Sequence, residues 1–175
     1  KSSSRAGSCV YLLQFVYSVE EFTAYAAQAL PETITTLPGY SPEILTKLTP
    51  TIQERVHVKS EITEAAEVGE YTWAFATPEV EKAMLQWKKD ETPEDALPRL
   101  QKVHELLQDA DFSTPEIIKE ALWDYAEEVG KGELLWPLRV SLTGLERSPD
   151  PFTCAYIVGK DEALLRITNA INKLQ

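Results

Sequence analysis

The sequence contains few of the residues that bind metal ions or form disulfides. It has two cysteines, Cys9 and Cys154, far apart in the chain, and two histidines, His57 and His104, without clustered partners. No Cys-x-x-Cys pair is present, so we expect no metal site. Reduced, buried cysteines are the expectation, as in a protein of the cytoplasm or, alternatively, of the mitochondrial matrix.

Long apolar runs are also missing. No run approaches the roughly 20 residues that a membrane-spanning helix needs, so we expect no membrane span. The basic start, Lys1 to Arg5, and the short apolar run from Val10 to Val16 only faintly resemble a signal peptide, because no small-residue cleavage site follows. Since the sequence starts at Lys1, we expect a fragment or a processed form.

Positive charge is scarce overall. The net charge of −11 argues against a general nucleic-acid binder, which should be basic. The charge is uneven, because residues 129–175 carry six positive and five negative side chains, a net of +1 that leaves −12 for the remainder. A locally neutral face could read a few unpaired bases but could not hold a long phosphate backbone.

Motifs of known catalytic chemistry are absent as well. The sequence shows no Ser-His-Asp set, no Gly-rich phosphate loop and no cluster of metal ligands. Adjacent acids such as Glu127 and Glu128 are typical of a solvated helix face. We therefore expect no catalytic residue in this chain.

What the sequence does contain is a recurring helix-start signal. A hydroxyl residue, a proline and an acid follow one another at Ser41-Pro42-Glu43, Thr77-Pro78-Glu79, Thr92-Pro93-Glu94, Thr114-Pro115-Glu116 and Ser148-Pro149-Asp150. The hydroxyl can accept the first free N–H groups, the proline stands where no N–H is needed, and the acid meets the positive end of the helix dipole. These signals predict an all-α fold.

Apolar periodicity places the helices between these signals. The expected helices are Ser18 to Pro31, Ser41 onward, Pro78 to Lys89, Thr92 to Ala110, Thr114 to Val129, Pro149 to Val158, and Asp161 to Leu174. We expect capping boxes at two of these helix starts, formed by Ser18 with Glu21 and by Ser113 with Glu116. Pro50 should kink or split its segment. Residues 33–40 read as a loop. The alternating aromatics at 71, 73 and 75 read as a plug between helices.

The least generic stretch runs from Gly132 to Lys160. Its first apolar run carries a single charge, Arg139. A buried charge is costly without a partner. Arg139 could therefore form an internal ion pair with one of the many carboxylates, or it could be presented to a ligand.

A family resemblance rests on this stretch. Pro137-Leu138-Arg139-Val140-Ser141-Leu142-Thr143-Gly144, followed by Ser148-Pro149, Phe152 and Gly159-Lys160, resembles the C-terminal anticodon-binding region of bacterial-type or organellar glutamyl-tRNA synthetases. The resemblance implies two small helical subdomains that form an α-helix-cage anticodon-binding region, with 41–112 and 113–175 as the subdomains and 1–40 as a poorly matched N-terminal segment. It also implies a helix entered at Pro137 and ended at Gly144.

The resemblance also implies the binding residues. Arg139 would contact the anticodon, and Ser148, Pro149 and Pro151 would pack on its splayed bases. Asp150-Pro151 departs from the family, which has glycine and an apolar residue there, so a carboxylate would adjoin the anticodon surface.

Arg55 is the second candidate for anticodon reading. In the family, an arginine in the segment that resembles Thr51 to Lys59 helps to separate glutamate from glutamine tRNAs, which differ at the last anticodon base, cytosine against guanine. Lys59 could hold this role if the register differs. Alternatively, Arg55 could simply pair with Glu54 or Glu61.

These residues predict a non-catalytic piece of a glutamate–tRNA ligase. The His-Ile-Gly-His-type nucleotide motif is missing, and Lys1 to Gly7 only faintly echoes the family's ATP-handling loop. ATP and Mg²⁺ would belong to the missing catalytic domain, and no cofactor or metal to this fragment. The expected partners are the tRNA-Glu anticodon loop and the catalytic domain in cis, with a monomeric protein. The alternatives are a non-enzymatic helical protein-interaction module and the related region of a class I lysyl-tRNA synthetase.

Overall fold

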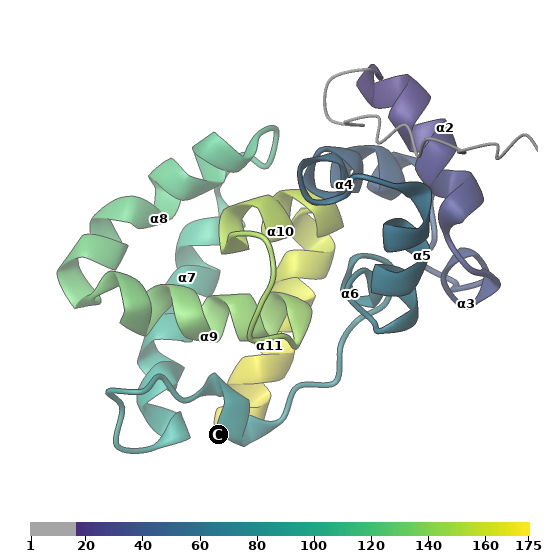
Figure 1. Ribbon diagram of the computed structural model, residues 1–175. Helices are drawn as coiled ribbons and strands as arrows, with labels where there is room; N and C mark the ends of the chain where they lie inside the picture. Colours follow the sequence, from purple (N-terminus) through teal and green to yellow (C-terminus); the bar gives the residue numbers. More distant parts are fainter. Residues whose placement is uncertain (1–16) are drawn as a thin grey trace, which may run out of the picture.

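The computed structural model describes residues 17–175, and within that range it contains helices joined by turns and loops, without a β-strand (Figure 1). The helices are α2 (Val19–Ala29), α3 (Glu32–Thr35), α4 (Pro42–Arg55), α5 (Lys59–Glu67), α6 (Thr72–Phe75), α7 (Leu97–Gln108), α8 (Pro115–Val129), α9 (Lys131–Thr143), α10 (Pro151–Val158) and α11 (Lys160–Leu174), with 3₁₀ turns η1 (Lys82–Leu85) and η2 (Pro93–Ala96). The all-α prediction is confirmed. None of these helices is both long and apolar enough to cross a bilayer.

Side-chain caps start several helices where the sequence signals predict them. The Ser18 hydroxyl accepts from the backbone N–H of Glu21, whose carboxylate accepts from the N–H of Ser18 in turn, so the capping box of α2 is present. Ser41 caps α4, and Thr114 caps α8 through the N–H of Ile117. The predicted Ser113 capping box is therefore wrong, because the cap lies one residue later.

Two of the start signals do not begin a helix at their hydroxyl residue. The predicted helix from Pro78 to Lys89 is reduced to the single turn η1, because the Thr77 hydroxyl donates to Glu162 of α11 instead of capping a helix. The last signal is shifted: α10 begins at Pro151, and the Asp150 carboxylate, not Ser148, accepts from the N–H of Thr153 at 2.9 Å.

Prolines are accommodated inside two helices. α4 continues through Pro50 and ends at Arg55, so the predicted split at Pro50 is wrong. α9 begins at Lys131 and contains Pro137, which corrects its predicted start. Pro137 has no N–H to donate to the carbonyl of Glu133 four residues earlier, and Nη1 of Arg99 donates to that carbonyl instead. The predicted end is confirmed, because Gly144 closes α9 with a left-handed φ of 66°.

The helices form two packed groups, seen on the right and the left of Figure 1. The first group holds α2 to α6, where α2 packs against α4 and α5. The second holds α7 to α11, where α11 packs against α7 and α9, and α8 packs against α7, α9 and α10. α10 also contacts α4 and α6, so the turn that precedes it lies where the groups meet. The subdomain boundary near residue 112 stays a prediction.

The buried aromatics and a buried arginine join the groups. Tyr71, Trp73 and Phe75 are all at least 95% buried, as expected for a plug between helices rather than a strand. Arg166 of α11 is 2% exposed and donates to the carbonyls of Trp73 at 2.7 Å and Leu142 at 2.6 Å. These carbonyls lie in α6 and α9, so a single side chain connects both groups.

Candidate functional site

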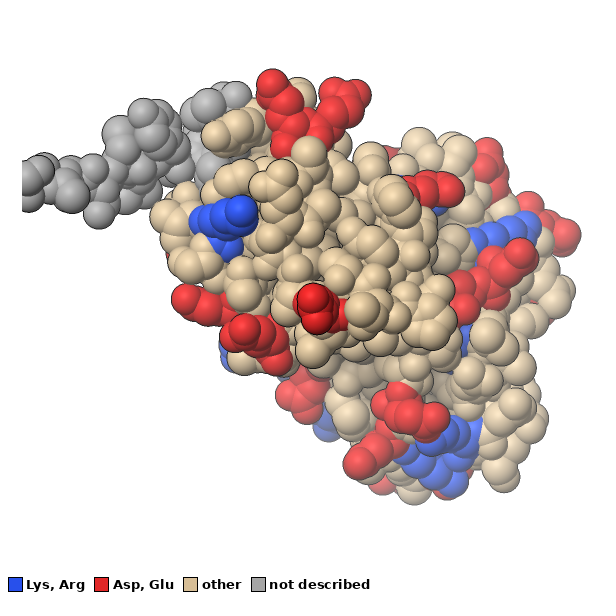
Figure 2. All heavy atoms as spheres, turned by 90° about the vertical axis from the view of Figure 1, so that its right-hand side faces the viewer, with Lys and Arg blue, Asp and Glu red and all other residues tan. Residues whose placement is uncertain are grey.

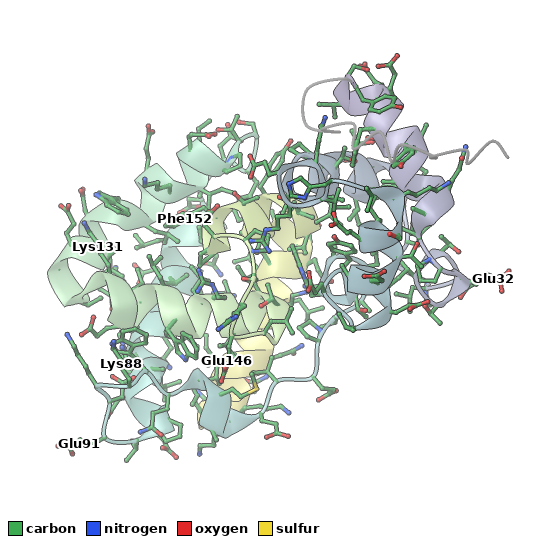
Figure 3. All side chains as sticks on the ribbon, in the orientation of Figure 1. Glu32, Lys88, Glu91, Lys131, Glu146 and Phe152 are labelled. Atoms are coloured by element: carbon green, nitrogen blue, oxygen red, sulfur yellow. The ribbon has the colours of Figure 1, made fainter. Side chains whose placement is uncertain are left out.

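A groove of about 290 Å³ lies between α4, the α5–α6 turn, α6 and the turn that joins α9 to α10. Its lining residues are Leu48, Thr51, Arg55, Val68, Gly69, Glu70, Tyr71, Trp73, Leu145, Glu146, Arg147, Ser148 and Pro149. Figure 3 labels Glu146, which lies near the middle of the molecule on the α9–α10 turn. The groove is therefore built by segments from both helix groups.

The groove brings together three of the five residues predicted to bind. Arg55 stands at the end of α4, and Ser148 and Pro149 stand on the α9–α10 turn. Pro151 does not line it, because it is buried in the first turn of α10. Arg139 does not line it either; it is half-buried on α9, within electrostatic reach of Cys154.

Hydrogen bonds hold the α9–α10 turn in place. The Thr143 hydroxyl donates to the carbonyl of Arg139 at 2.9 Å and accepts from the N–H of Leu145 at 3.1 Å. At the other end, the Ser148 hydroxyl and the Cys154 thiol both donate to the carbonyl of Pro149, at 2.8 and 3.4 Å. The apolar face of Pro149 is thereby presented in a fixed position.

The structure also explains the departure at Asp150. Its carboxylate accepts from both the N–H and the hydroxyl of Thr153, at 2.9 and 2.6 Å. The negative charge therefore caps the N-terminus of α10, where the positive end of the helix dipole stabilises it. Pro151 fits the next position, where no N–H is required.

Arg139 does not form the internal ion pair that its burial first suggests. Its Nε is buried without a hydrogen-bond partner, and no carboxylate pairs with its guanidinium within residues 17–175. A buried, unsatisfied donor costs about 1–3 kcal/mol. The ion-pair hypothesis instead fits Arg166, which bonds Glu162 at 2.8 Å.

Arg55 is exposed at the groove and does not pair with Glu61. The Glu61 carboxylate instead accepts from the backbone N–H of Val58 at 3.3 Å and lies 3.6 Å from the His57 ring. Lys59 lies over the ring of Tyr25, 5.4 Å from its centroid, and does not line the groove. Geometry therefore favours Arg55 over Lys59 at this position.

A second hollow continues the groove past Pro149. It shares the lining residues Thr51, Arg55 and Pro149 with the first hollow, and Tyr156 also lines it. The Lys47 ammonium lies 5.0 Å from the centroid of the Tyr156 ring. Together the two hollows offer apolar and aromatic surfaces beside cations, the combination on which unpaired bases stack.

Sequence reasoning missed several lining residues. Tyr71 and Trp73 were assigned to packing alone, although both also face the groove. Burial raises the pKa of Tyr71 to about 12, so its phenol is neutral at physiological pH. Arg147 and Tyr156 lie in no recognisable motif, and only the fold places them beside Arg55.

The histidines and acids that the structure describes outside the groove do not gather into a set of metal ligands. His104 lies beside Thr168, with Nε2 and the hydroxyl 3.2 Å apart. Within residues 17–175 no three metal-ligating side chains come together.

Cys154 is expected to resist alkylation. Burial raises the pKa of its thiol to about 12, so almost no thiolate exists at pH 8. In a Cys9→Ser variant, iodoacetamide at pH 8 should modify Cys154 at least about 100-fold more slowly in the native protein than in urea. Mass spectrometry of timed samples measures both rates, and equal rates would show that the α10 region opens freely. Cys9 lies outside the described residues.

Comparisons with known proteins identify the family. A family model described as "Anticodon binding domain" matches residues 14–171. Glutamate–tRNA ligase of Flavobacterium johnsoniae is 34% identical over 135 residues, which are 75% of this chain and 25% of the relative. That of Clostridium novyi is 31% identical over 162 residues, 90% of this chain and 32% of the relative.

Solved structures give the same result. The crystal structure of a glutamate tRNA ligase from Elizabethkingia meningosepticum, in complex with its amino acid, superimposes with a TM-score of 0.70 at 30% identity. The match covers 93% of this chain and 30% of that one. The chain thus spans about a quarter to a third of the length of these relatives, and the resemblance seen in the sequence is confirmed.

Proposed function

From the premise that this chain belongs to the anticodon-binding domain family, we propose that it reads the anticodon loop of a glutamate tRNA as part of a glutamate–tRNA ligase. The observation that carries the proposal is the groove itself. It places Arg55 of one helix group beside Ser148 and Pro149 of the other, and α9, which leads into that turn, carries Arg139, whose Nε has no hydrogen-bond partner within residues 17–175. Unpaired bases suit such a site better than a duplex does.

Each residue has a separate part in this mechanism. Arg139, which is half-buried at the end of α9 and does not line the groove, would donate from the accessible part of its guanidinium to a base edge beside the α9–α10 turn. Arg55 contacts the last anticodon base from the opposite wall. Ser148 and Pro149 support a splayed base, and Pro151 holds the turn on α10. A wrong base leaves a buried polar group unpaired, at a cost of about 1–3 kcal/mol.

The charge distribution fits local reading rather than backbone binding. In the space-filling view from the side of the first helix group, acidic side chains border a broad uncharged area, and basic ones are sparse (Figure 2). With a net charge of −11, the protein would repel a long phosphate backbone. Binding should therefore show only a small salt dependence.

The rest of the activity is proposed to lie outside this chain. A catalytic domain in cis would bind ATP and Mg²⁺ and join glutamate to the acceptor end, while this part selects the tRNA. We place the protein in the cytoplasm and expect it to act as a monomer.

Affinity for glutamate and glutamine tRNA transcripts tests this function. We expect the chain to prefer the glutamate tRNA by about tenfold at moderate salt, because the wrong base forfeits about 1.4 kcal/mol. Fluorescence anisotropy at two salt concentrations measures both affinities. Equal and steeply salt-dependent binding would indicate non-specific attraction and contradict the proposal.

A further inference from the structure

Arg147 is a groove residue to which neither the motif nor the mechanism above assigns a part. It lies on the α9–α10 turn between Glu146 and Ser148, and its side chain lines the groove together with Arg55. It is exposed and forms no hydrogen bond or ion pair within residues 17–175. A guanidinium that folding leaves free in a binding groove is available to a ligand.

Within residues 17–175, Arg147 is unpaired although carboxylates line the same groove. Two carboxylates, Glu70 and Glu146, line the same groove, yet neither lies within ion-pair distance of Arg147. The charged lining residues are thus two arginines and two glutamates, which sum to zero. Without Arg147 the groove would carry a net charge of −1 on a protein that is already strongly acidic. An RNA strand could then enter only against repulsion.

Contacts at both ends of the α9–α10 turn hold it in place. Gly144 reverses the chain with its positive φ, Thr143 bonds Leu145, and Cys154 holds Pro149. Arg147 stands between these anchored ends, next to the surface of Ser148 and Pro149 on which a base would rest. The phosphate that follows such a base lies within the reach of an arginine side chain.

We propose that Arg147 binds a backbone phosphodiester of the RNA segment in the groove, while Arg55 and Arg139 read bases. The proposal rests on the proposed function, because it presumes that single-stranded RNA occupies the groove. The ligand class is a phosphodiester, which the guanidinium meets with a two-pronged, charge-assisted contact. Because every nucleotide carries this group, Arg147 adds affinity without adding sequence preference.

The test compares Arg147→Ala with the wild-type chain on glutamate and glutamine tRNA transcripts over a series of salt concentrations. We expect the variant to bind both transcripts about fivefold more weakly at low salt, with an unchanged ratio between them. The slope of log affinity against log salt should fall by about 0.7, the loss of one single-strand phosphate contact. Arg147→Lys should keep most of the slope, because it keeps the charge.

Lys88→Ala is the matched control. It also removes one positive charge from an exposed side chain, and Lys88 lies well away from Glu146 and the groove (Figure 3). Its salt slope should equal that of the wild type. An unchanged slope in Arg147→Ala, or a change in the ratio of the two affinities, would overturn the phosphate assignment. A wild type without preference would instead refute the proposed function, and the slopes would still decide whether Arg147 contacts phosphate.

Discussion

Replacing Arg139 by alanine is expected to weaken binding of glutamate and glutamine tRNAs alike by about 10- to 100-fold. The side chain is half-buried and has no ion pair within residues 17–175, so the accessible N–H groups of its guanidinium are open to a base. Hydrogen bonds from a charged donor contribute about 1.5–3 kcal/mol, which gives this range. Titration of both transcripts by anisotropy measures the affinities, and unchanged affinities would contradict the assignment.

For the stability of the same variant we expect only a small change. Because the buried Nε is unsatisfied in the free protein, removing it should cost little free energy of unfolding, about 1 kcal/mol or less. Arg139→Lys keeps the charge but loses the planar fork, so it should recover only part of the affinity. A large loss of stability in Arg139→Ala would show that the arginine serves the fold and not the ligand.

Replacing Arg166 by methionine is expected to give the largest loss of stability, about 3–5 kcal/mol. Its buried side chain pairs with Glu162 and donates to carbonyls of α6 and α9. Methionine fills similar space but leaves the carbonyls of Trp73, Leu142 and Ala76 without their donor, and each buried acceptor left unsatisfied costs about 1–3 kcal/mol. Urea unfolding followed by circular dichroism measures the change. A loss below about 1 kcal/mol would mean that the two helix groups do not depend on this side chain.

Acid should weaken the contact that Arg166 and Glu162 make between the two helix groups. Burial alone would raise the pKa of Glu162, but the bonds from Thr77 and Arg166 hold it below its ordinary value of 4.5. A carboxyl group with a lowered pKa stabilises the fold above its unfolded pKa, and this contribution disappears as the pH falls through the folded value. Below pH 4.5 the wild type should therefore lose stability faster than Glu162→Gln, which cannot titrate. Parallel loss in both proteins would contradict this role.

Local signals in the sequence predicted much of the helix pattern. The caps at Ser18, Ser41 and Thr114 and the glycine that ends α9 act through neighbours only a few residues away, so the sequence alone specifies them. Thr77 carries the same signal, but its hydroxyl bonds Glu162 of α11, a contact between residues far apart in the chain. Tertiary contacts of this kind override a local preference, and no pattern within the segment reports them.

The prolines show the same limit. Pro137 stays inside α9 because Arg99, on another helix, donates to the carbonyl that proline leaves free. The predicted start at Pro137 follows from the family resemblance, and no local pattern shows that the helix continues N-terminally to Lys131.

For the site, the sequence supplied candidates but not their arrangement. Arg139 stood out as a lone charge in an apolar run, whereas the buried arginines that form ion pairs are Arg99 and Arg166. Arg55 and Ser148 were proposed separately, and only the packing of α10 on α4 brings them to one groove. No local sequence pattern marks Arg147 as a binding residue, because its availability depends on which carboxylates lie within ion-pair distance of it in the fold.

The central claim is that this chain reads anticodon bases, and one base change tests it most directly. Affinity should be measured for a glutamate tRNA transcript and for the same transcript with the last anticodon base changed from cytosine to guanine. We predict about tenfold weaker binding of the changed transcript, with nearly the same salt slope for both. Equal affinity for the two transcripts would contradict anticodon reading, because no other feature of the RNA differs between them.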